Sequence, residues 1–309
     1  MSLPTGEQHH LHSEGAHGPV TATVIELAAG LRSLSVGGVD LVQDYAAVSL
    51  PSWGSGIVLV PWPNRVAGAR WTDDDGKAQQ LDITEPSRGN AIHGLLRNTG
   101  YRVTDRSDSA VTLTAQVFPQ HGYPFHLDTS VRYELGEDGI TVTHGIHNAG
   151  DRPAPVGIGA HPFLRVGDTP MRDLTVTVHA ATYFEVDERM IPVAEHPVAG
   201  TEYDLSRGRP LAEATLDTPF GGVQLIDGRA RHRLTAPDGS GVELWGSEDF
   251  AFTQVFTTDQ YVSPSGIIDA VAIEPMTCPP DALNSRRGIR MLAPDEQWVT
   301  SWGIRFLPA

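Results

Sequence analysis

Three titratable side chains lie in segments where the sequence restricts the backbone. Glu274 ends a short apolar run and directly precedes Pro275, which lacks a backbone donor and favours an extended conformation at Glu274. His161 also directly precedes a proline, and glycines just upstream leave room for a close approach to the backbone. Together with His93, these residues offer the general base and general acid of proton-transfer chemistry. Each has an ordinary alternative, because a strand-end Glu often faces solvent and a lone His is usually a hydrogen-bonded core or surface residue.

Four polar side chains near these segments offer hydrogen bonds of complementary kinds. Asn64 and Arg65 follow two prolines, and Asp217 and Gln254 lie in short segments that also contain phenylalanine. Their amide, guanidinium and carboxylate groups both donate and accept, as the recognition of sugar hydroxyls requires. A structural ion pair for Arg65, a turn cap for Asp217 and an edge position for Gln254 are the alternatives. Trp62 fits a core position as well as a platform for a sugar ring.

The elements that position these side chains are predicted to be β-strands. Short alternating runs flank tight turns at residues 37–38, 137–139 and 238–239, each typical of a hairpin. Gly and Pro recur throughout, and no long stretch has helical periodicity. Consecutive hairpins imply antiparallel pairing, so we expect an all-β fold, a large antiparallel β-sandwich. It is predicted to occupy residues 21–309 as a single domain, after a disordered tail at residues 1–20.

The predicted tail contains four histidines, His9, His10, His12 and His17. An unconstrained cluster of this kind makes a poor ligand set, so we expect no functional metal site there. Cys278 is the only cysteine, which excludes an intrachain disulfide and a thiolate metal cluster and suits a reducing compartment.

Composition narrows the classes of partner. The chain has 309 residues and a net charge of −16, and its 22 Lys and Arg form no run, which argues against a nucleic-acid partner. No apolar run is long enough for a membrane span and no secretory signal is visible, so we expect no membrane partner and a cytoplasmic location. The phosphate-binding loop, the zinc His-Glu-x-x-His motif and the Gly-x-Ser-x-Gly elbow are all missing, so we predict no cofactor and no metal.

Several short motifs, taken in order, resemble the aldose 1-epimerase family, whose members are also called galactose mutarotases. The resemblance covers nearly the whole chain after the tail, and its most specific parts are Asn64–Val66, Ile92–Gly94, His161–Phe163, Leu216–Phe220, Ile273–Pro275 and Pro280–Ala282. It implies a β-sandwich of the galactose-mutarotase type that interconverts the α and β anomers of a free aldose without a cofactor. Leu95, in place of a second glycine after His93, and the segment Pro275–Pro280 look more like a bacterial branch of the family.

The same resemblance implies a role for each candidate residue. Glu274 corresponds to the general base at the anomeric hydroxyl, His161 to the general acid at the ring oxygen, and His93 to a residue that helps to hold that oxygen. A protonated His161 beside an ionised Glu274 is expected to be easy to maintain near neutral pH. The substrate-binding positions are Asn64, Arg65, Asp217 and Gln254. This mixture of one cation, one anion and amides favours a neutral aldohexose.

Two other functions fit the same sequence. A hexose-6-phosphate mutarotase would need cations for the phosphate, and Arg70, Arg88, Arg97 and Arg165 are candidates. A non-catalytic carbohydrate-binding or regulatory module could share the fold, since a fold does not determine activity. In each case the expected partner is a small sugar, and the protein is expected to be a monomer or a homodimer.

Overall fold

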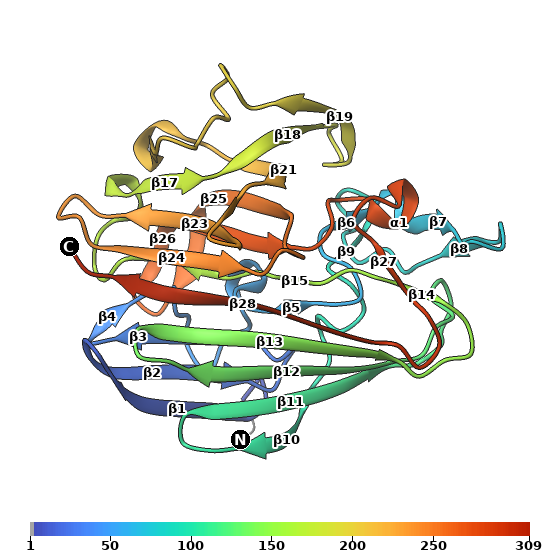
Figure 1. Ribbon diagram of the computed structural model, residues 1–309, viewed down its shortest axis with the longest axis horizontal. Coiled ribbons are helices and arrows are strands. Elements are labelled where there is room, and N and C mark those ends of the chain that lie inside the picture. The colour runs from blue at the N-terminus through green and yellow to red at the C-terminus, as the bar shows by residue number, and fades with distance from the viewer. Residues whose placement is uncertain (1–2) are drawn as a thin grey trace.

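The computed structural model describes residues 3–309, which fold almost entirely into antiparallel β-strands (Figure 1). Within that range the one α-helix is α1 (Ala282–Ser285), and short 3-10 turns occur at Ser52–Gly54, Ala67–Ala69, Met171–Asp173 and Leu211–Glu213. No helix in this part of the chain is long and apolar enough to cross a membrane. The predicted all-β, antiparallel fold class is confirmed.

A ten-stranded sheet forms the largest layer. Its strands, in spatial order, are β10 (Arg102–Arg106), β11 (Ala110–Val117), β12 (Leu127–Leu135), β13 (Gly139–Asn148), β28 (Gln297–Leu307), β24 (Gly241–Gly246), β23 (Arg229–Thr235), β17 (Thr175–Val178) and β20 (Arg209–Pro210), with β22 (Leu225–Ile226) paired to β23. Strand β12 shows why the sheet forms, because every second side chain from Leu127 to Leu135 is buried. This alternation gives the sheet one face for the core.

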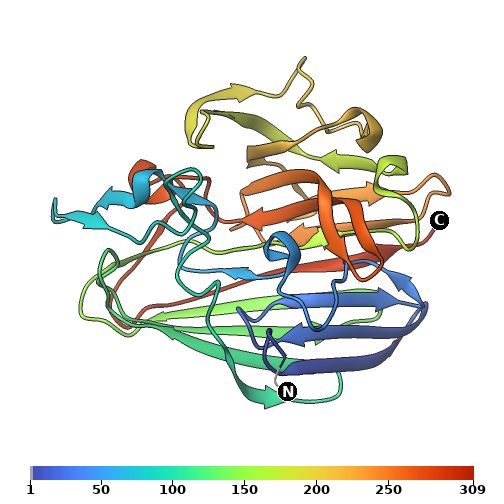
Figure 2. The same cartoon turned by 180° about the vertical axis from the view of Figure 1, so that it is seen from behind.

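Two further sheets pack against this layer. The first contains β1 (Gln8–Gly15), β2 (Gly18–Ile25), β3 (Leu31–Val36) and β4 (Val39–Asp40). The second contains β19 (Pro192–Pro197), β18 (Ala180–Val186), β21 (Asp217–Val223), β25 (Phe252–Ser263), β26 (Gly266–Met276), β15 (Gly159–Ala160) and β5 (Val58–Leu59), with β16 (Phe163–Leu164) paired to β26. Strands β2 and β3 contact β12 and β13, and β26 contacts β24. Figure 2 shows these two sheets in front of the ten-stranded sheet.

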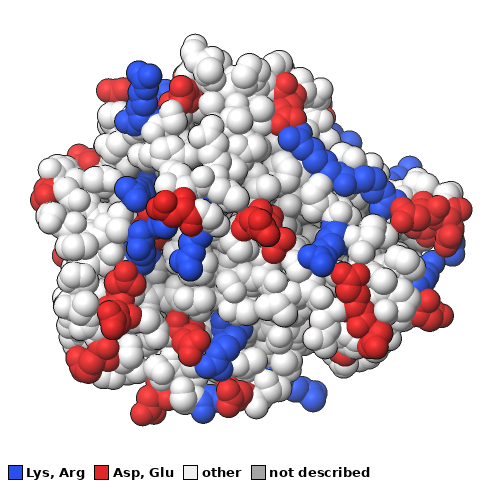
Figure 3. Space-filling model, viewed as in Figure 1, with Lys and Arg blue, Asp and Glu red and all other residues white. Residues whose placement is uncertain are grey.

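Three two-stranded sheets complete the strand set. They pair β14 (Ala154–Val156) with β27 (Arg290–Leu292), β6 (Arg65–Val66) with β9 (Ala91–Ile92), and β7 (Arg70–Thr72) with β8 (Ala78–Gln80). The last two pairs lie beside α1 at the right-hand end of the molecule in Figure 1. We call this group of β6 to β9 and α1 the arm. Acidic and basic side chains are interspersed on the face shown in Figure 3.

The three hairpins predicted from turn residues are confirmed. Val36 pairs with Val39 across Gly37 and Gly38, both of which adopt positive φ angles that suit glycine. The second hairpin joins β12 to β13 and the third joins β23 to β24, with the expected turns between them.

The predicted N-terminal tail is wrong over most of its length. Residues 8–15 form β1, which pairs along its whole length with β2, and Leu11 is buried in the main core cluster. Because most residues of β1 are polar, the sequence did not reveal that buried and exposed side chains alternate along it. His9 and Leu11 are buried, whereas His10 and His12 are exposed. His9 therefore points to the opposite face of the strand from His10 and His12. Residues 1–2 of the predicted tail lie outside the described residues.

Strand β1 generates a stability prediction. Leu11→Ala should lower the free energy of unfolding by about 2–5 kcal/mol, because it removes a buried side chain and leaves a cavity. The matched control is His12→Ala on the opposite face of the same strand, whose side chain is 59% exposed and which should change stability by no more than about 0.5 kcal/mol. Urea unfolding of both variants measures the difference. Equal stabilities would mean that β1 does not contribute to the core.

Candidate active site

All seven predicted site residues line one cleft of about 390 Å³ between the arm and the eight-stranded sheet. Those residues are Asn64, Arg65, His93, His161, Asp217, Gln254 and Glu274. They come from segments far apart in the chain, and the pairing of the strands brings them together. The cleft is also lined by Trp53, Gly54, Thr84, Glu85, Arg88, Ile92, Arg97 and Phe256.

The floor of the cleft is formed by neighbouring strands of the eight-stranded sheet. Gln254 on β25 lies directly opposite Glu274 on β26, and Asp217 begins the adjacent strand β21. The sequence predicted that the strand would end at Glu274, but β26 continues to Met276, which pairs with both Phe252 and Gly159. Proline is compatible with an extended backbone, so the strand continues beyond it.

The arm contributes the other wall through two residues with unusual backbone conformations. Asn64 and His93 both have positive φ angles, 55° and 64°, and the His93 N–H donates to the Asn64 carbonyl at 2.9 Å. Left-handed conformations of this kind are costly for residues other than glycine, and they are held here by the pairing of β6 with β9. They turn both side chains into the cleft.

Asp281 stabilises the backbone of this wall through hydrogen bonds. Its N–H donates to the Arg65 carbonyl at 2.7 Å, and its side-chain oxygen accepts the Ala67 N–H at 2.9 Å. Asn284 donates to the same carboxylate oxygen at 2.7 Å. The Pro280–Ala282 segment therefore holds the backbone that carries Arg65.

His161 and Glu274 form a close, buried pair. Nε2 of His161 lies 3.4 Å from Oε1 of Glu274, and the two side chains are 7% and 3% exposed. His93 meets the His161 ring edge-on at 5.3 Å, and Phe163 stacks on its other side at 5.4 Å. The His161 ring is therefore fixed on two sides, with one nitrogen directed at the carboxyl group.

Burial shifts the pKa of each member of this group towards its neutral form. It raises the pKa of Glu274 well above the usual range, with a contribution from Asp217 and opposition from Arg65. Burial lowers the pKa of His161 to about 4, and burial together with the charge of His161 lowers the pKa of His93 well below its usual value. The expected protonated histidine beside an ionised carboxylate is therefore not the state that burial favours, because desolvation penalises both charges.

A chain of hydrogen bonds crosses the cleft beside the pair. Nδ2 of Asn64 donates to Oε1 of Gln254 at 3.2 Å, and Nε2 of Gln254 donates to Oδ1 of Asp217 at 2.7 Å. Asn64 also accepts the Arg65 N–H at 3.0 Å. Gln254 is thus oriented on both sides, and one oxygen of Asp217 is left for another donor. These contacts do not match the turn cap that was considered for Asp217 or the edge position that was considered for Gln254.

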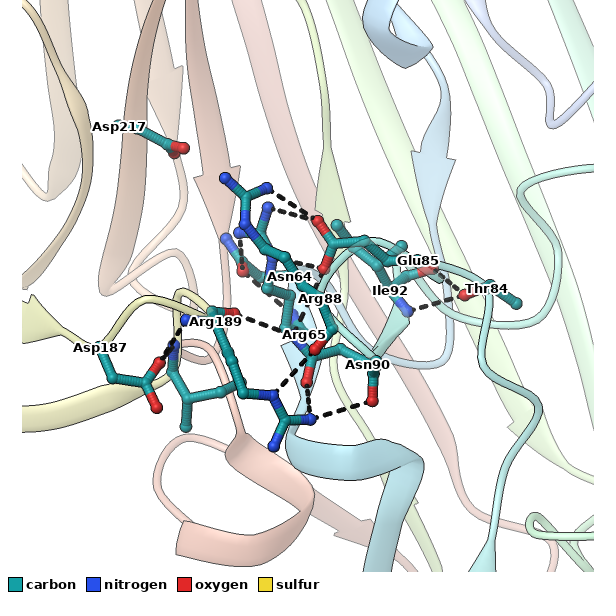
Figure 4. A network of polar contacts seen from close by, with 12 residues as sticks. Asn64, Arg65, Thr84, Glu85, Arg88, Asn90, Ile92, Asp187, Arg189 and Asp217 are labelled. Carbon is teal, nitrogen blue, oxygen red and sulfur yellow. Dashed lines mark hydrogen bonds and ion pairs between the residues drawn. The ribbon is translucent and has the colours of Figure 1, made fainter.

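Glu85 holds two arginines at the cleft wall, as Figure 4 shows. It accepts from Nε and Nη2 of Arg65 at 2.9 and 3.0 Å and from Nη1 of Arg88 at 3.0 Å. Burial opposes the ionisation of Glu85, but hydrogen bonds from both arginines outweigh burial and lower its pKa. Arg65 is therefore both the structural ion pair and the cleft-lining residue that the sequence offered as alternatives.

The loop around Asn90 is tied to the hairpin that joins β18 and β19. Arg189 from that hairpin donates to the carbonyls of Arg88 and Gly89, at 2.8 and 3.0 Å, and to the Asn90 side chain at 3.0 Å. Asn90 in turn donates to the Arg189 carbonyl at 2.9 Å. We call this reciprocal set of contacts the Arg189 tether (Figure 4).

Other expectations from the sequence are resolved by burial. Trp62 is 2% exposed and belongs to the core, whereas Trp53, which sequence reasoning missed, is 51% exposed and lies against Phe256 at the cleft. Trp53 lies next to a Gly in a Pro- and Ser-containing loop, a weak signal that is common to many loops.

The glycines upstream of His161 do permit a close approach, but the group that approaches them is part of the protein. A Cβ at Gly157 would lie 2.4 Å from the Cys278 sulfur.

Two of the four arginines considered for a phosphate line the cleft. These are Arg88 and Arg97, whereas Arg70 bonds to Gln80 on β8 and Arg165 pairs with Asp168 on a surface loop. Glu85 was not singled out from the sequence, because its partner Arg65 is distant in the chain and nothing local marks it.

A larger groove of about 750 Å³ lies over β10 to β13 and β28, but it is a weaker candidate. Its ionisable side chains are Arg102, Asp128 and His147, and the last two already contact each other at 3.5 Å. The smaller cleft is therefore the better site, since it gathers buried groups with shifted pKa values. Among residues 3–309, no three His, Cys, Asp or Glu side chains are grouped as metal ligands.

Comparison with known proteins identifies the family of the chain. The profile described as aldose 1-epimerase matches residues 14–305. The chain is 30% identical over 298 residues to the uncharacterised protein YihR of Escherichia coli K12, covering 94% of this chain and 93% of YihR. It is 29% identical over 174 residues to the human galactose mutarotase, of which it covers 49%.

Solved structures share the fold. An aldose epimerase homologue from C. elegans matches with a TM-score of 0.82 at 16% identity, covering 97% of this chain and 99% of that chain. Galactose 1-epimerase from Lactobacillus acidophilus matches with a TM-score of 0.75 at 17% identity, covering 97% and 98%. With the profile match over nearly its whole length, the chain belongs to the aldose 1-epimerase family.

Proposed function

We propose that the protein is an aldose 1-epimerase that interconverts the α and β anomers of a free aldose by acid–base ring opening and closure. The observation that supports this most directly is the 3.4 Å approach of His161 Nε2 to Glu274 Oε1 inside the cleft. Glu274 Oε2 and the Nδ1 atoms of His161 and His93 have no hydrogen-bond partner among residues 3–309. Buried polar atoms normally have partners, and hydroxyl and ring oxygens of a sugar would supply them.

In this proposal the pair moves one proton at each end of the reacting bond. The Glu274 carboxylate takes the proton of the anomeric hydroxyl, the anomeric oxygen becomes a carbonyl oxygen, and the bond from C1 to the ring oxygen breaks. The ring oxygen receives a proton from His161, assisted by His93. Rotation about the C1–C2 bond presents the other face of the aldehyde, and the reverse transfers close the ring.

The shifted pKa values fit this cycle. After ring opening, Glu274 is protonated and His161 is neutral, which is the state that burial favours for both groups. Before ring opening, His161 carries the proton and Glu274 is ionised, so the pair holds the same number of protons before and after this step. The protein therefore does not exchange a proton with solvent during the reaction. Low polarity in the cleft therefore stabilises the pair when the open-chain sugar is bound.

Substrate binding is assigned to the polar wall of the cleft. Arg65 and Asn64 donate to hydroxyls, Asp217 accepts, and Gln254 keeps Asp217 in place. The partner in this proposal is a small sugar. A cytoplasmic location and a monomeric or dimeric state stay predictions from the sequence.

A hexose-6-phosphate mutarotase is the second candidate, favoured by the presence of Arg88 and Arg97 in the cleft. Arg88 is already paired with Glu85 at 3.0 Å, so it offers less charge to a phosphate than an unpaired arginine would. A non-catalytic module is the third, and the close acid–base pair argues against it.

The first test of the function removes one partner of the pair. Glu274→Gln or His161→Ala should each slow the mutarotation of freshly dissolved α-glucose or α-galactose by roughly a hundredfold to ten-thousandfold, because general acid–base catalysis is lost. Polarimetry follows the reaction, and thermal melting checks that the variants fold. The control is Glu134→Gln, which removes an exposed carboxylate that pairs with Arg132 and should leave the rate unchanged. Near-normal activity of a folded Glu274→Gln variant would contradict the assignment.

The second test is the pH profile of kcat/KM, which should be bell-shaped. As pH falls through the His161 pKa of about 4, the pair gains a second proton and no base remains. As pH rises through the raised Glu274 pKa, the pair loses its last proton and no acid remains. Subtraction of the uncatalysed rate at each pH isolates the enzyme. An acid limb at the ordinary histidine value of about 6.5 would show that burial does not control the pair.

The third test concerns the hydroxyl acceptor. Asp217→Asn keeps the shape of the side chain but removes a charged acceptor, which should cost about 1.5–3 kcal/mol, or roughly tenfold to a hundredfold in kcat/KM. Asp168→Asn is the matched control, since Asp168 is fully exposed and pairs only with Arg165 at the surface. Steady-state kinetics with a sugar that the unmodified enzyme accepts would measure both, and equal values for the two variants would remove Asp217 from the binding site.

A further inference from the structure

Of the three arginines that line the cleft, Arg97 alone has no carboxylate partner among residues 3–309. Arg65 and Arg88 both pair with Glu85, at 2.9 and 3.0 Å. The one hydrogen bond that Arg97 makes in that range is weak, from Nη1 to the Ile92 carbonyl at 3.4 Å. Its Nε is buried and has no hydrogen-bond partner. Arg97 therefore lines the cleft as a cation without a carboxylate partner in the part of the chain that the structure describes.

This arrangement is unfavourable for the protein by itself. A half-buried guanidinium without a counter-ion loses part of its solvation, and no group of the protein replaces it. Consistent with this, burial lowers the pKa of Arg97, opposed only by the more distant charge of Glu85. An anionic group on a bound ligand would give Arg97 the partner that the chain does not provide.

The position of Arg97 in the cleft indicates where that group would lie. Nη1 of Arg97 lies 3.4 Å from the carbonyl oxygen of Ile92, the residue that precedes His93, and the charge of Arg97 helps to lower the pKa of His93 and His161. Asp217 lies at the start of β21, accepts a hydrogen bond from Gln254 at 2.7 Å, and has a pKa that is affected by Arg65 and Arg88. Arg97 is therefore next to the segment that carries His93, whereas Asp217 is on a strand of the sheet.

The chemistry of a pyranose connects these histidines to one substituent. The ring oxygen, to which His161 delivers its proton in the proposed mechanism, is bonded to C1 and to C5. Glu274 acts on the C1 side, so C5 and the group attached to it, C6, lie on the other side of the ring oxygen. A substituent on C6 is therefore the part of the sugar that Arg97 would meet.

We propose that the cleft takes aldoses that carry a monoanionic group on C6, such as the carboxylate of a hexuronic acid, and that Arg97 is the residue that selects them. The inference rests on the proposed function. It departs from the neutral aldohexose expected from residue types alone. One unpaired cation balances one negative charge, whereas a phosphate carries nearly two at neutral pH. This charge balance separates the proposal from the hexose-6-phosphate alternative.

The experiment compares glucuronate, glucose and glucose 6-phosphate as mutarotation substrates of the full-length protein, by polarimetry or NMR. The unmodified enzyme should favour glucuronate over glucose in kcat/KM by roughly tenfold to a hundredfold, the effect of one charge-assisted hydrogen bond. Arg97→Gln should bring this ratio close to one, and Arg97→Lys should retain most of it because the charge remains. Arg70→Gln is the matched control: Arg70 bonds to Gln80 outside the cleft, and the ratio should not change.

A second measurement tests the position of Arg97 independently of the sugar's charge. Removing a positive charge near His161 should make protonation of the histidine easier, so the acid limb of the Arg97→Gln profile should move to higher pH. A role for Arg97 in folding alone would not move this limb, and thermal melting of both Arg97 variants checks that they fold.

The outcomes are distinguishable. Absence of mutarotation with all three sugars would overturn the proposed function itself. Mutarotation with equal kcat/KM for glucose and glucuronate would overturn the inference and leave the function intact. A preference for glucose 6-phosphate would replace the monoanion site with a phosphate site, and a preference for glucuronate that survives in Arg97→Gln would assign the selectivity to another residue.

Discussion

The register between β25 and β26 is the constraint on which the site depends. Their pairing sets Gln254 opposite Glu274 on one face of the sheet, and the adjacent β21 brings Asp217 within 2.7 Å of Gln254. Successive residues of a strand face opposite sides, so a slip of one residue would turn Glu274 into the other face of the sheet. The Thr253 hydroxyl reinforces the register by donating to the Glu274 carbonyl at 2.9 Å.

Electrostatic control of the site follows from where this sheet lies. The ten-stranded sheet covers one side of β26 and the arm covers the cleft, so Glu274 and His161 are both removed from water. Charge is instead concentrated at the wall, where Glu85 holds the Arg65 guanidinium in place through two hydrogen bonds. The cleft thus combines a polar wall for hydroxyl groups with an acid–base pair whose proton is held weakly enough to move.

The sequence predicted the strands and their hairpins well because Gly turns and alternation are local signals. It missed β1, where the inward-facing His9 and Leu11 lie among polar residues. The motifs pointed to seven residues that line one cleft, yet the burial and contacts of these residues could not be predicted. The difference between Arg97, which lines the cleft, and Arg165, which lies on the surface, depends on strand pairing between distant segments and has no local signature.

The Arg189 tether joins the loop that leads to His93 with a hairpin of the eight-stranded sheet. Because these two segments are linked through both side chains and backbone, the tether restrains movement of the Asn90 loop relative to the sheet. In the proposed reaction, substrate and product differ only in the orientation of one hydroxyl group, so a lid that distinguishes them would bring no advantage. Under the proposed function, a restrained cleft would leave turnover to proton transfer and to exchange of the two anomers with the surrounding solution rather than to loop motion.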